Sequence, residues 1–225
     1  MTRFIVVRHG RSVANNDGVF SCMQDVPLAD AGKAQAECVA AYLHQHESID
    51  KIYTSGMQRT DQTAAPTAAL FHLPLHTERG LREIFPGLWE GLPYAEIAKR
   101  YTADWHNWRF DFSNARCTAG ESVRELYRRI QATLHRLAAE NEGKTVMLTT
   151  HYTPLRLMVA MAMGYAPEQV HLSSIPTNAT VNVLRYEAER LHLELADLVT
   201  YPEHLYSTNS HPLPPRMPHT RLNKK

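Results

Sequence analysis

Short apolar, β-branched runs recur along the chain at intervals that leave room for a helix between them. The runs at residues 4–7 and 145–150 predict two buried strands, and a weaker run at 51–54 predicts a third. Alternating apolar and polar residues at 179–186 and 191–198 predict two further strands, the last at an antiparallel edge.

Two amphipathic helices are predicted from apolar residues that return every three or four positions. Ser122 and Glu125 form a capping-box pattern before the second helix, and Gly143 is a suitable stop after it. The apolar positions are Leu28, Ala31, Val39, Tyr42 and Leu43 in the first helix, and Val123, Leu126, Tyr127, Ile130, Leu134, Leu137 and Ala138 in the second.

Strands that alternate with helices predict an α/β fold, a three-layer α/β/α sandwich with a mostly parallel central sheet. Between about residues 85 and 120 the periodicity fails and aromatic residues crowd together, which predicts a helical lid insertion whose rings serve packing. We expect a single domain over 1–210, since 225 residues suit one core, and a Pro-rich basic tail over 211–225.

The charge balance and the cysteine content limit which kinds of binding partner and which cellular compartment are expected. Lys+Arg 24 against Asp+Glu 23 gives a formal net charge of +1, so no global field recruits nucleic acid or a membrane. Cys22, Cys38 and Cys117 are odd in number and lack metal-like spacing, which favours a reducing compartment. The apolar run at residues 4–7 is far too short for a signal-peptide core, and no apolar run reaches the length of a membrane span. We expect a cytoplasmic protein with a small-molecule partner; a homodimer stays open.

Imidazole and guanidinium side chains follow the predicted strands. Arg8 and His9 come directly after the first strand, Arg59 comes shortly after 51–54, and His151 comes directly after 145–150. Ligands of such sheets bind beyond the carboxyl ends of the strands, so these four side chains should converge. Guanidinium forks match the oxygens of an oxyanion, and the set therefore predicts a phosphate site.

Two helix starts are expected to point free backbone N–H groups at the same edge. Ser55 and Gln58 form a second capping-box pattern, from which Arg59 should project in the first helical turn. Thr153 followed by Pro154 resembles an N-cap with proline at the first helical position. Both helix ends would then favour an anion.

We expect His9 to be a nucleophile and not a metal ligand. Arg8 and Arg59 would repel a divalent cation and hold the imidazole neutral, so no metal and no cofactor is expected. Attack by His9 on a phosphate monoester would form a phosphoenzyme that water then hydrolyses. His151 would stabilise the equatorial phosphoryl oxygens.

Glu83 is the candidate proton donor to the leaving oxygen. A carboxyl desolvated beneath the lid and facing phosphate would have its pKa raised toward neutrality. Glu90 and Glu121 are alternative candidates.

The spacings of His44 with His46 and of His72 with His76 also resemble metal-binding pairs. Neither pair is joined by a set of carboxylates or cysteines in the sequence, so we expect surface histidines.

Beyond these residues, ordered blocks over roughly residues 3–186 resemble the histidine phosphatase superfamily, the phosphoglycerate mutase-like proteins. The resemblance implies a phosphatase with the catalytic residues His9, Arg8, Arg59, Glu83 and His151. The blocks are Arg8-His9-Gly10 with Asn15, Asp25 to Leu28 through Gly32 and Gln35-Ala36, Tyr53-Thr54-Ser55 through Arg59 and Gln62 to Ala64, Leu81 and Glu83 with Gly87 and Trp89-Glu90-Gly91, Gly120-Glu121-Ser122, and His151.

Three positions depart from the family pattern and are expected to affect specificity. Arg11 stands where the family often has Glu, Tyr152 where Gly commonly follows the second histidine, and Cys22 where Gly is frequent. Arg11 would read a second anionic group or pair with a carboxylate, and Tyr152 would narrow the pocket. Asn15 and Ser21 are candidate phosphate contacts, although both residue types also form turns.

Three functions remain open. The first is a phosphatase acting on a small phosphorylated metabolite. The second is a bisphosphate-primed phosphoglycerate mutase, which needs a basic run in the lid; here the basic residues between 99 and 116 are dispersed. The third is a non-catalytic anion-binding module on the same scaffold.

Overall fold

The computed structural model describes residues 1–173 and 176–206, apart from the side chains of residues 16 and 17. The predicted tail at 211–225 and the domain end at residue 210 lie outside the described residues. The strands are β1 Thr2–Arg8, β2 Lys51–Thr54, β3 Leu75–Thr77, β4 Thr145–Thr150, β5 Val181–Glu187 and β6 Arg190–Leu198. The α-helices are α1 Val13–Asp17, α2 Asp30–His46, α3 Gln58–Phe71, α4 Tyr94–Arg100, α5 Thr102–Phe110, α6 Val123–Glu140 and α7 Tyr152–Ala162.

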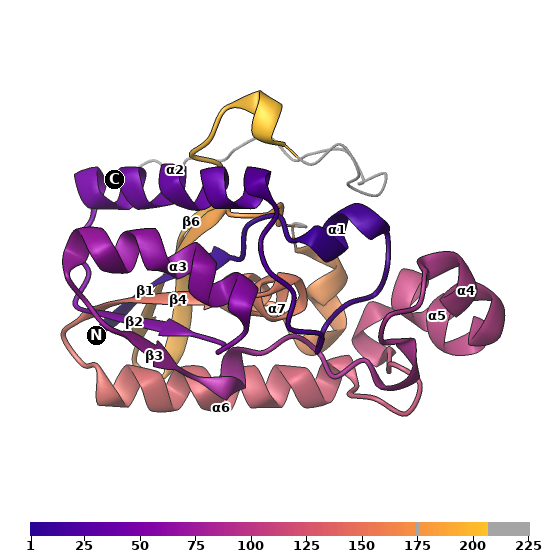
Figure 1. The fold of residues 1–225 in the computed structure, drawn as a ribbon. Coiled ribbons are helices and arrows are strands. Elements are labelled where there is room, and N and C mark those ends of the chain that lie inside the picture. Colours follow the sequence, from indigo (N-terminus) through magenta and orange to yellow (C-terminus); the bar gives the residue numbers. More distant parts are fainter. Residues whose placement is uncertain (174–175, 207–225) are drawn as a thin grey trace.

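A six-stranded sheet with the order β3-β2-β4-β1-β5-β6 forms the centre of the molecule (Figure 1). β1 with β4, β4 with β2, and β2 with β3 pair in parallel, whereas β5 is antiparallel to both β1 and β6. The predicted α/β class and the antiparallel edge are therefore confirmed. The short edge strand β3 was not predicted, because its three residues are exposed or half-buried and carry no apolar run.

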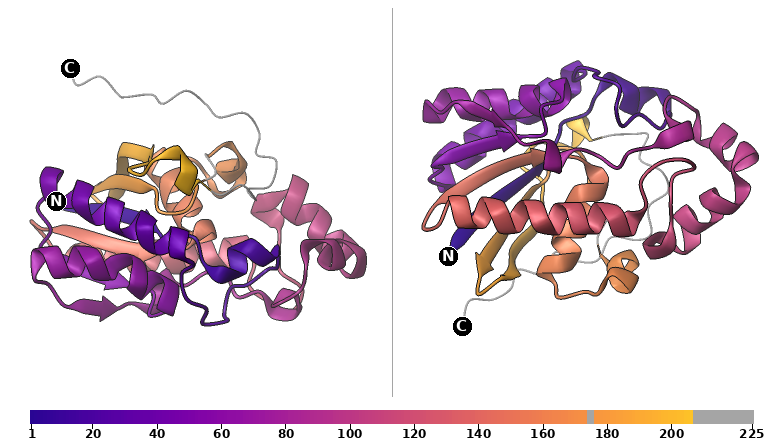
Figure 2. Two further views of the ribbon diagram at one scale, coloured as in Figure 1. Left: turned by 45° about the horizontal axis from the view of Figure 1, so that its top comes forward. Right: turned by 90° about the horizontal axis from the view of Figure 1, so that it is seen from below.

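Alternate residues of β1 supply two separate cores, and this alternation produces the three layers. Phe4 and Val6 pack in the core that includes residues of α6 and α7. Ile5 and Val7 pack in the core that includes residues of α2 and α3. Accordingly, α2 and α3 cover one face of the sheet and α6 runs across the other (Figures 1 and 2).

The long helix α6 begins where its sequence signals place it. The Ser122 hydroxyl accepts a hydrogen bond from the Glu125 N–H, and the Glu125 carboxylate accepts one from the Ser122 N–H. The helix ends at Glu140, with Asn141 as its C-cap, and Gly143 (φ +79°) lies in the turn beyond. In α2, Leu43 is buried as predicted, whereas Leu28 is buried but precedes the helix.

The segment between η2 (Gly87–Trp89) and η3 (Phe112–Asn114) forms the lid as two short helices, α4 and α5, at one end of the molecule (Figure 2). Trp89 is fully buried, and the Phe20 ring contacts it edge-on at 5.4 Å between centroids. Trp108 makes the same kind of contact with Trp89 at 5.6 Å. These aromatic rings pack the lid onto the loop that follows α1.

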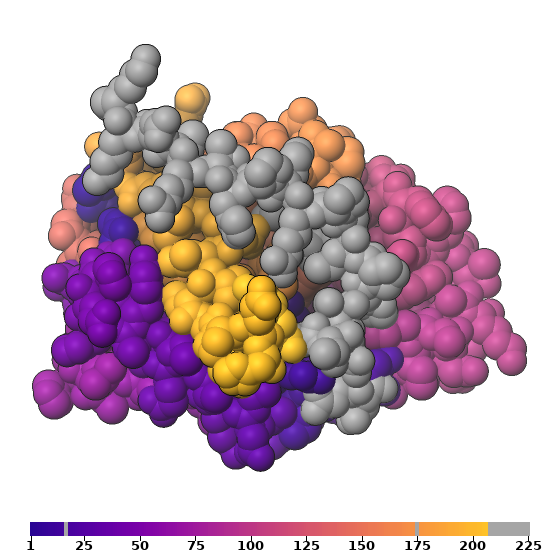
Figure 3. Space-filling view, turned by 90° about the horizontal axis from the view of Figure 1, so that it is seen from above, coloured from indigo at the N-terminus to yellow at the C-terminus, as the bar shows by residue number. Residues whose placement is uncertain are grey.

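Residues 199–206, which contain η5 (Glu203–Leu205), lie beside α2 on one face of the molecule (Figure 3). The Gln35 side chain of α2 donates a hydrogen bond to the Leu205 carbonyl at 2.8 Å. No helix in the described part of the chain is long and apolar enough to cross a bilayer.

Candidate active site

His9 follows β1 directly and is 5 % exposed. Its Nδ1 lies 2.7 Å from the carbonyl oxygen of Gly10. A carbonyl oxygen only accepts hydrogen bonds, so Nδ1 carries the proton of the neutral ring. The lone pair is therefore on Nε2, the nitrogen that a nucleophilic imidazole needs free.

Close backbone approach holds the loop that carries His9. A Cβ on Gly32 of α2 would lie 2.1 Å from the carbonyl oxygen of Arg11, so only glycine fits there. The Gly10 N–H donates to the Thr63 hydroxyl of α3 at 2.9 Å. Two helices thus fix the position of the His9 backbone.

His151 follows β4, the parallel neighbour of β1, and its ring centroid lies 5.2 Å from that of His9. Its Nε2 is 2.8 Å from the Ser55 hydroxyl, which is also 2.9 Å from the Thr60 hydroxyl. Its Nδ1 is buried with no hydrogen-bond partner among the described residues. If Ser55 donates to Nε2, Nδ1 carries the proton and is free to donate to an oxyanion.

Arg59 lies in the first turn of α3, as predicted, and its side chain is almost completely buried. Its guanidinium donates to the carbonyl oxygens of Cys22 at 2.6 Å and Gln24 at 2.9 Å. Arg8 donates to the Pro176 carbonyl at 2.7 Å and stacks over the Tyr152 ring at 5.1 Å. Neither arginine forms an ion pair with a described residue.

The two arginines bias both imidazoles toward the neutral form. Burial, then the charges of Arg59 and Arg8, lower the pKa of His9 well below its ordinary value. Burial, then Arg59 and His9, do the same to the pKa of His151. The four side chains predicted to converge therefore share one electrostatic environment.

Glu83 is buried and reaches the start of α7. Its Oε2 accepts from the Thr153 N–H at 3.1 Å, and its Oε1 accepts from the Ile84 N–H at 2.8 Å. Burial raises the pKa of Glu83, while these two N–H groups and Arg8 oppose the shift. Its carboxyl is thus brought to the helix start beside His151.

The two alternative acids have other partners. Glu90 accepts hydrogen bonds from three consecutive N–H groups, those of Cys22, Met23 and Gln24, at 3.0–3.2 Å. Glu121 pairs with Arg129 at 2.8 Å and accepts from the Phe85 N–H at 3.1 Å. Both carboxylates hold loops, whereas the Glu83 carboxyl bonds the N–H of Thr153, two residues after His151.

Both predicted helix caps at the site are wrong. α3 starts at Gln58 with Met57 as its N-cap, and Ser55 instead bonds His151. α7 starts at Tyr152 with His151 as its N-cap, so Thr153 lies inside the helix. The Thr153 N–H donates a hydrogen bond to the Glu83 carboxylate and is therefore not free to bind phosphate.

Of the four residues predicted to contact the substrate, Tyr152 and Asn15 have partners within the protein, whereas Ser21 and Arg11 each have a buried polar atom without one among the described residues. Tyr152 stacks under Arg8, and Asn15 accepts from the Ser12 N–H at 3.0 Å and from the Asn178 amide at 3.3 Å. The Ser21 hydroxyl and the Arg11 Nε are buried without a hydrogen-bond partner among the described residues. No carboxylate of the described chain pairs with Arg11.

Asn178 was not predicted to contribute to the site. Its amide donates to the His9 carbonyl at 3.0 Å, and its own carbonyl accepts from the Tyr201 hydroxyl at 2.6 Å. The sequence shows Asn178 only as part of an incidental glycosylation sequon, so no signal in it pointed to this role. Asn178 and Ser55 act by holding the two histidines.

Paired imidazoles and arginines beyond the carboxyl ends of parallel strands are the arrangement expected of a phosphate-binding α/β protein. A model of the histidine phosphatase superfamily (branch 1) matches residues 4–198. The chain therefore belongs to the histidine phosphatase superfamily.

Individual relatives agree with this assignment. The chain is 30% identical over 194 residues to phosphoserine phosphatase 1 of Hydrogenobacter thermophilus, covering 84% of this chain and 89% of the relative. It is 28% identical to the adenosylcobalamin/alpha-ribazole phosphatase of Salmonella typhimurium, covering 70% and 78%. The structure of Bacillus stearothermophilus YhfR shares the fold, with a TM-score of 0.82, 22% identity, and coverage of 88% of this chain and 97% of that chain.

Proposed function

We propose that this protein is a metal-independent phosphomonoesterase that works through a phosphohistidine on His9. The observation that carries the proposal is the 2.7 Å contact between His9 Nδ1 and the Gly10 carbonyl, which leaves Nε2 with its lone pair. In the first step Nε2 bonds to phosphorus, the ester P–O bond breaks, and Glu83 gives its proton to the leaving oxygen. In the second step water bonds to phosphorus, the N–P bond breaks, and the Glu83 carboxylate takes the water's proton.

Fixed donors would stabilise the charge that builds on the phosphoryl oxygens. Arg8, Arg59 and the Nδ1–H of His151 supply these donors, and because they are already ordered they cost little reorganisation. The same guanidinium charges disfavour a divalent cation at the site. This supports catalysis without a metal ion.

The test is hydrolysis of p-nitrophenyl phosphate with and without a chelator, by the native protein and by His9→Ala. We expect activity that survives chelation and is lost in the variant. Acid-labile, base-stable labelling of His9 by a radioactive substrate would identify the intermediate. Loss of activity on chelation, or full activity in His9→Ala, would refute the mechanism.

The other candidate functions give different results in the same assays. Rapid interconversion of 2- and 3-phosphoglycerate with a bisphosphate primer, and little hydrolysis, would show a mutase. Phosphate binding without either reaction would show a non-catalytic module. We further propose a reducing, cytoplasmic compartment, supported by the three free thiols, Cys22, Cys38 and Cys117; cell fractionation tests it.

A further inference from the structure

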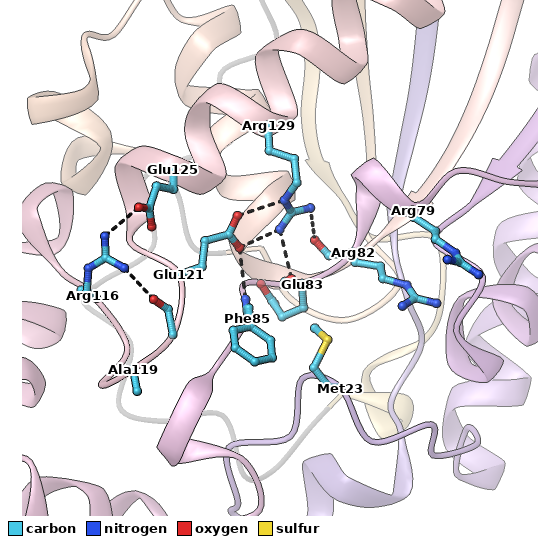
Figure 4. Close-up of a pocket in the computed structure, with 11 residues that line it drawn as sticks. Met23, Arg79, Arg82, Glu83, Phe85, Arg116, Ala119, Glu121, Glu125 and Arg129 are labelled. Carbon is cyan, nitrogen blue, oxygen red and sulfur yellow. Dashed lines mark hydrogen bonds and ion pairs between the residues drawn. The ribbon is translucent and has the colours of Figure 1, made fainter.

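A pocket of about 570 Å³ lies beside Glu83 (Figure 4). Its walls come from the loop at Met23, from the segment that runs through η1 (Arg79–Leu81) to Phe85, and from the loop and first turns of α6 at residues 116–129. The volume is typical of small-ligand sites. Glu83 lines this pocket and is also the proposed proton donor of the active site, so the pocket adjoins the place where the leaving group would be protonated.

Arginine dominates the polar lining, and two of the four arginines are already neutralised. Arg116 pairs with Glu125 at 2.7 Å, and Arg129 pairs with Glu121 at 2.8 Å. Figure 4 shows these two pairs on one side of the pocket.

Arg79 and Arg82 line the opposite side and form no ion pair with any described residue. The neighbouring carboxylate, Glu78, is already bound to Arg136. Arg82 donates from Nε to the Ser55 carbonyl at 3.3 Å, and its terminal N–H groups have no hydrogen-bond partner in the part of the chain that the structure describes. Two of the four arginines that line the pocket are therefore unpaired among the described residues, and Glu83, which bonds backbone N–H groups, is the one lining carboxyl outside the ion pairs.

We propose that Arg79 and Arg82 bind a second anionic group, carried by the leaving group of the substrate. The inference rests on the proposed function, because a leaving group protonated by Glu83 must lie on the Glu83 side of the phosphoryl group. The preferred substrates are then phosphate monoesters whose alcohol part bears a carboxylate or a second phosphate. Met23 and Phe85 provide apolar surface for the short chain that joins the two groups.

A matched substrate series tests the proposal: 3-hydroxypropyl phosphate, 3-(phosphonooxy)propanoate and propane-1,3-diyl bisphosphate, which differ only in the far group. The native protein should show a kcat/KM at least about tenfold higher for one or both anionic esters than for the hydroxypropyl ester, the low end for a charged hydrogen bond. The comparison between carboxylate and phosphate identifies the anion.

Arg79→Ala should lower that ratio toward one, mainly through KM. This side chain is exposed and forms no ion pair with a described residue, so its removal should leave the fold intact. Arg82→Lys keeps the charge and should retain part of the ratio, whereas Arg79→Ala with Arg82→Ala should abolish it. Arg128→Ala, an exposed arginine of α6 outside the pocket, is the matched control and should keep the native ratio.

Two results overturn the inference in distinguishable ways. Hydrolysis of all three esters with equal kcat/KM, or a ratio unchanged in Arg79→Ala with Arg82→Ala, refutes the anion site and leaves the phosphatase mechanism intact. Hydrolysis of none of them, nor of p-nitrophenyl phosphate, refutes the proposed function and this inference with it.

Discussion

Removal of the Glu90 carboxylate should disable the site without removing any reacting group. In Glu90→Ala the N–H groups of Cys22, Met23 and Gln24 lose their shared acceptor. A hydrogen bond to a charged group contributes about 1.5–3 kcal/mol. Here three N–H groups share two oxygens at 3.0–3.2 Å, and the exposed Gln24 N–H regains water. The buried Cys22 N–H does not, so we expect a net loss of about 2 kcal/mol.

A loss of that size corresponds to a fall in Tm of about 4–8 °C for a chain of this length. Activity should fall by about 10²-fold, because Arg59 binds the carbonyl oxygens of the same loop and a displaced guanidinium no longer fits the phosphoryl oxygens. Glu90→Gln, which keeps one acceptor oxygen, should lie between the native protein and Glu90→Ala.

The decisive assay compares p-nitrophenyl phosphate, whose leaving group needs little protonation, with an alkyl phosphate, whose leaving group needs it. A displaced loop should reduce kcat/KM for both substrates by the same factor. A much larger loss for the alkyl phosphate would show that Glu90 is the proton donor. The inference that Glu90 acts only by holding the loop at residues 22–24 would then be wrong.

The remaining predictions concern the acid and the two imidazoles. Glu83→Gln should lower kcat at least about 10²-fold on an alkyl phosphate and much less on p-nitrophenyl phosphate, as measured in steady state; equal losses would rule out the acid role. Because the lowered pKa values of His9 and His151 keep both rings neutral in the folded protein, the unfolded chain binds more protons below about pH 6.5. The urea midpoint should therefore fall as the pH drops through that value, and less so in a variant without both histidines. Ser55→Ala removes the His151 partner, worth about 1 kcal/mol, and should lower kcat about fivefold; an unchanged kcat would exclude an orienting role.

The strands and helices that were predicted well are those whose burial leaves a pattern in the sequence, either a continuous run or a periodic stripe. β2 and β4 begin and end at the predicted residues; both lie in the interior of the sheet, and β4 has the longer apolar run. α6 shows both its apolar stripe and its cap in the sequence. β3 was missed because its three residues, at the edge of the sheet, show neither an apolar run nor a helix-cap signal.

The supporting contacts of the site could not be predicted, since they join residues far apart in the chain. Ser55 reads locally as a helix cap, but His151, 96 positions away, takes its hydroxyl. Glu90 reads as one more loop carboxylate until the N–H groups of residues 22–24 are placed around it. Asn178 bonds a carbonyl 169 positions away. Single polar residues in loops carry no periodicity, so only the folded chain reveals their partners.

In the proposed mechanism, the Glu83 carboxyl would serve first as an acid and then as a base, and its contacts are consistent with both roles. Two backbone N–H groups, including that of Thr153 in the first turn of α7, favour the carboxylate, while burial favours the protonated acid. Because these influences on the pKa of Glu83 oppose each other, a charge that binds nearby can change its protonation state. A phosphate dianion between His9 and Arg59 would shift the balance toward the protonated form needed to release the alcohol. Once the alcohol leaves, the same N–H groups stabilise the carboxylate that must accept a proton from water. A phosphate-filled start of α7, as the sequence suggested, would have left Glu83 with the Ile84 N–H but without the Thr153 N–H.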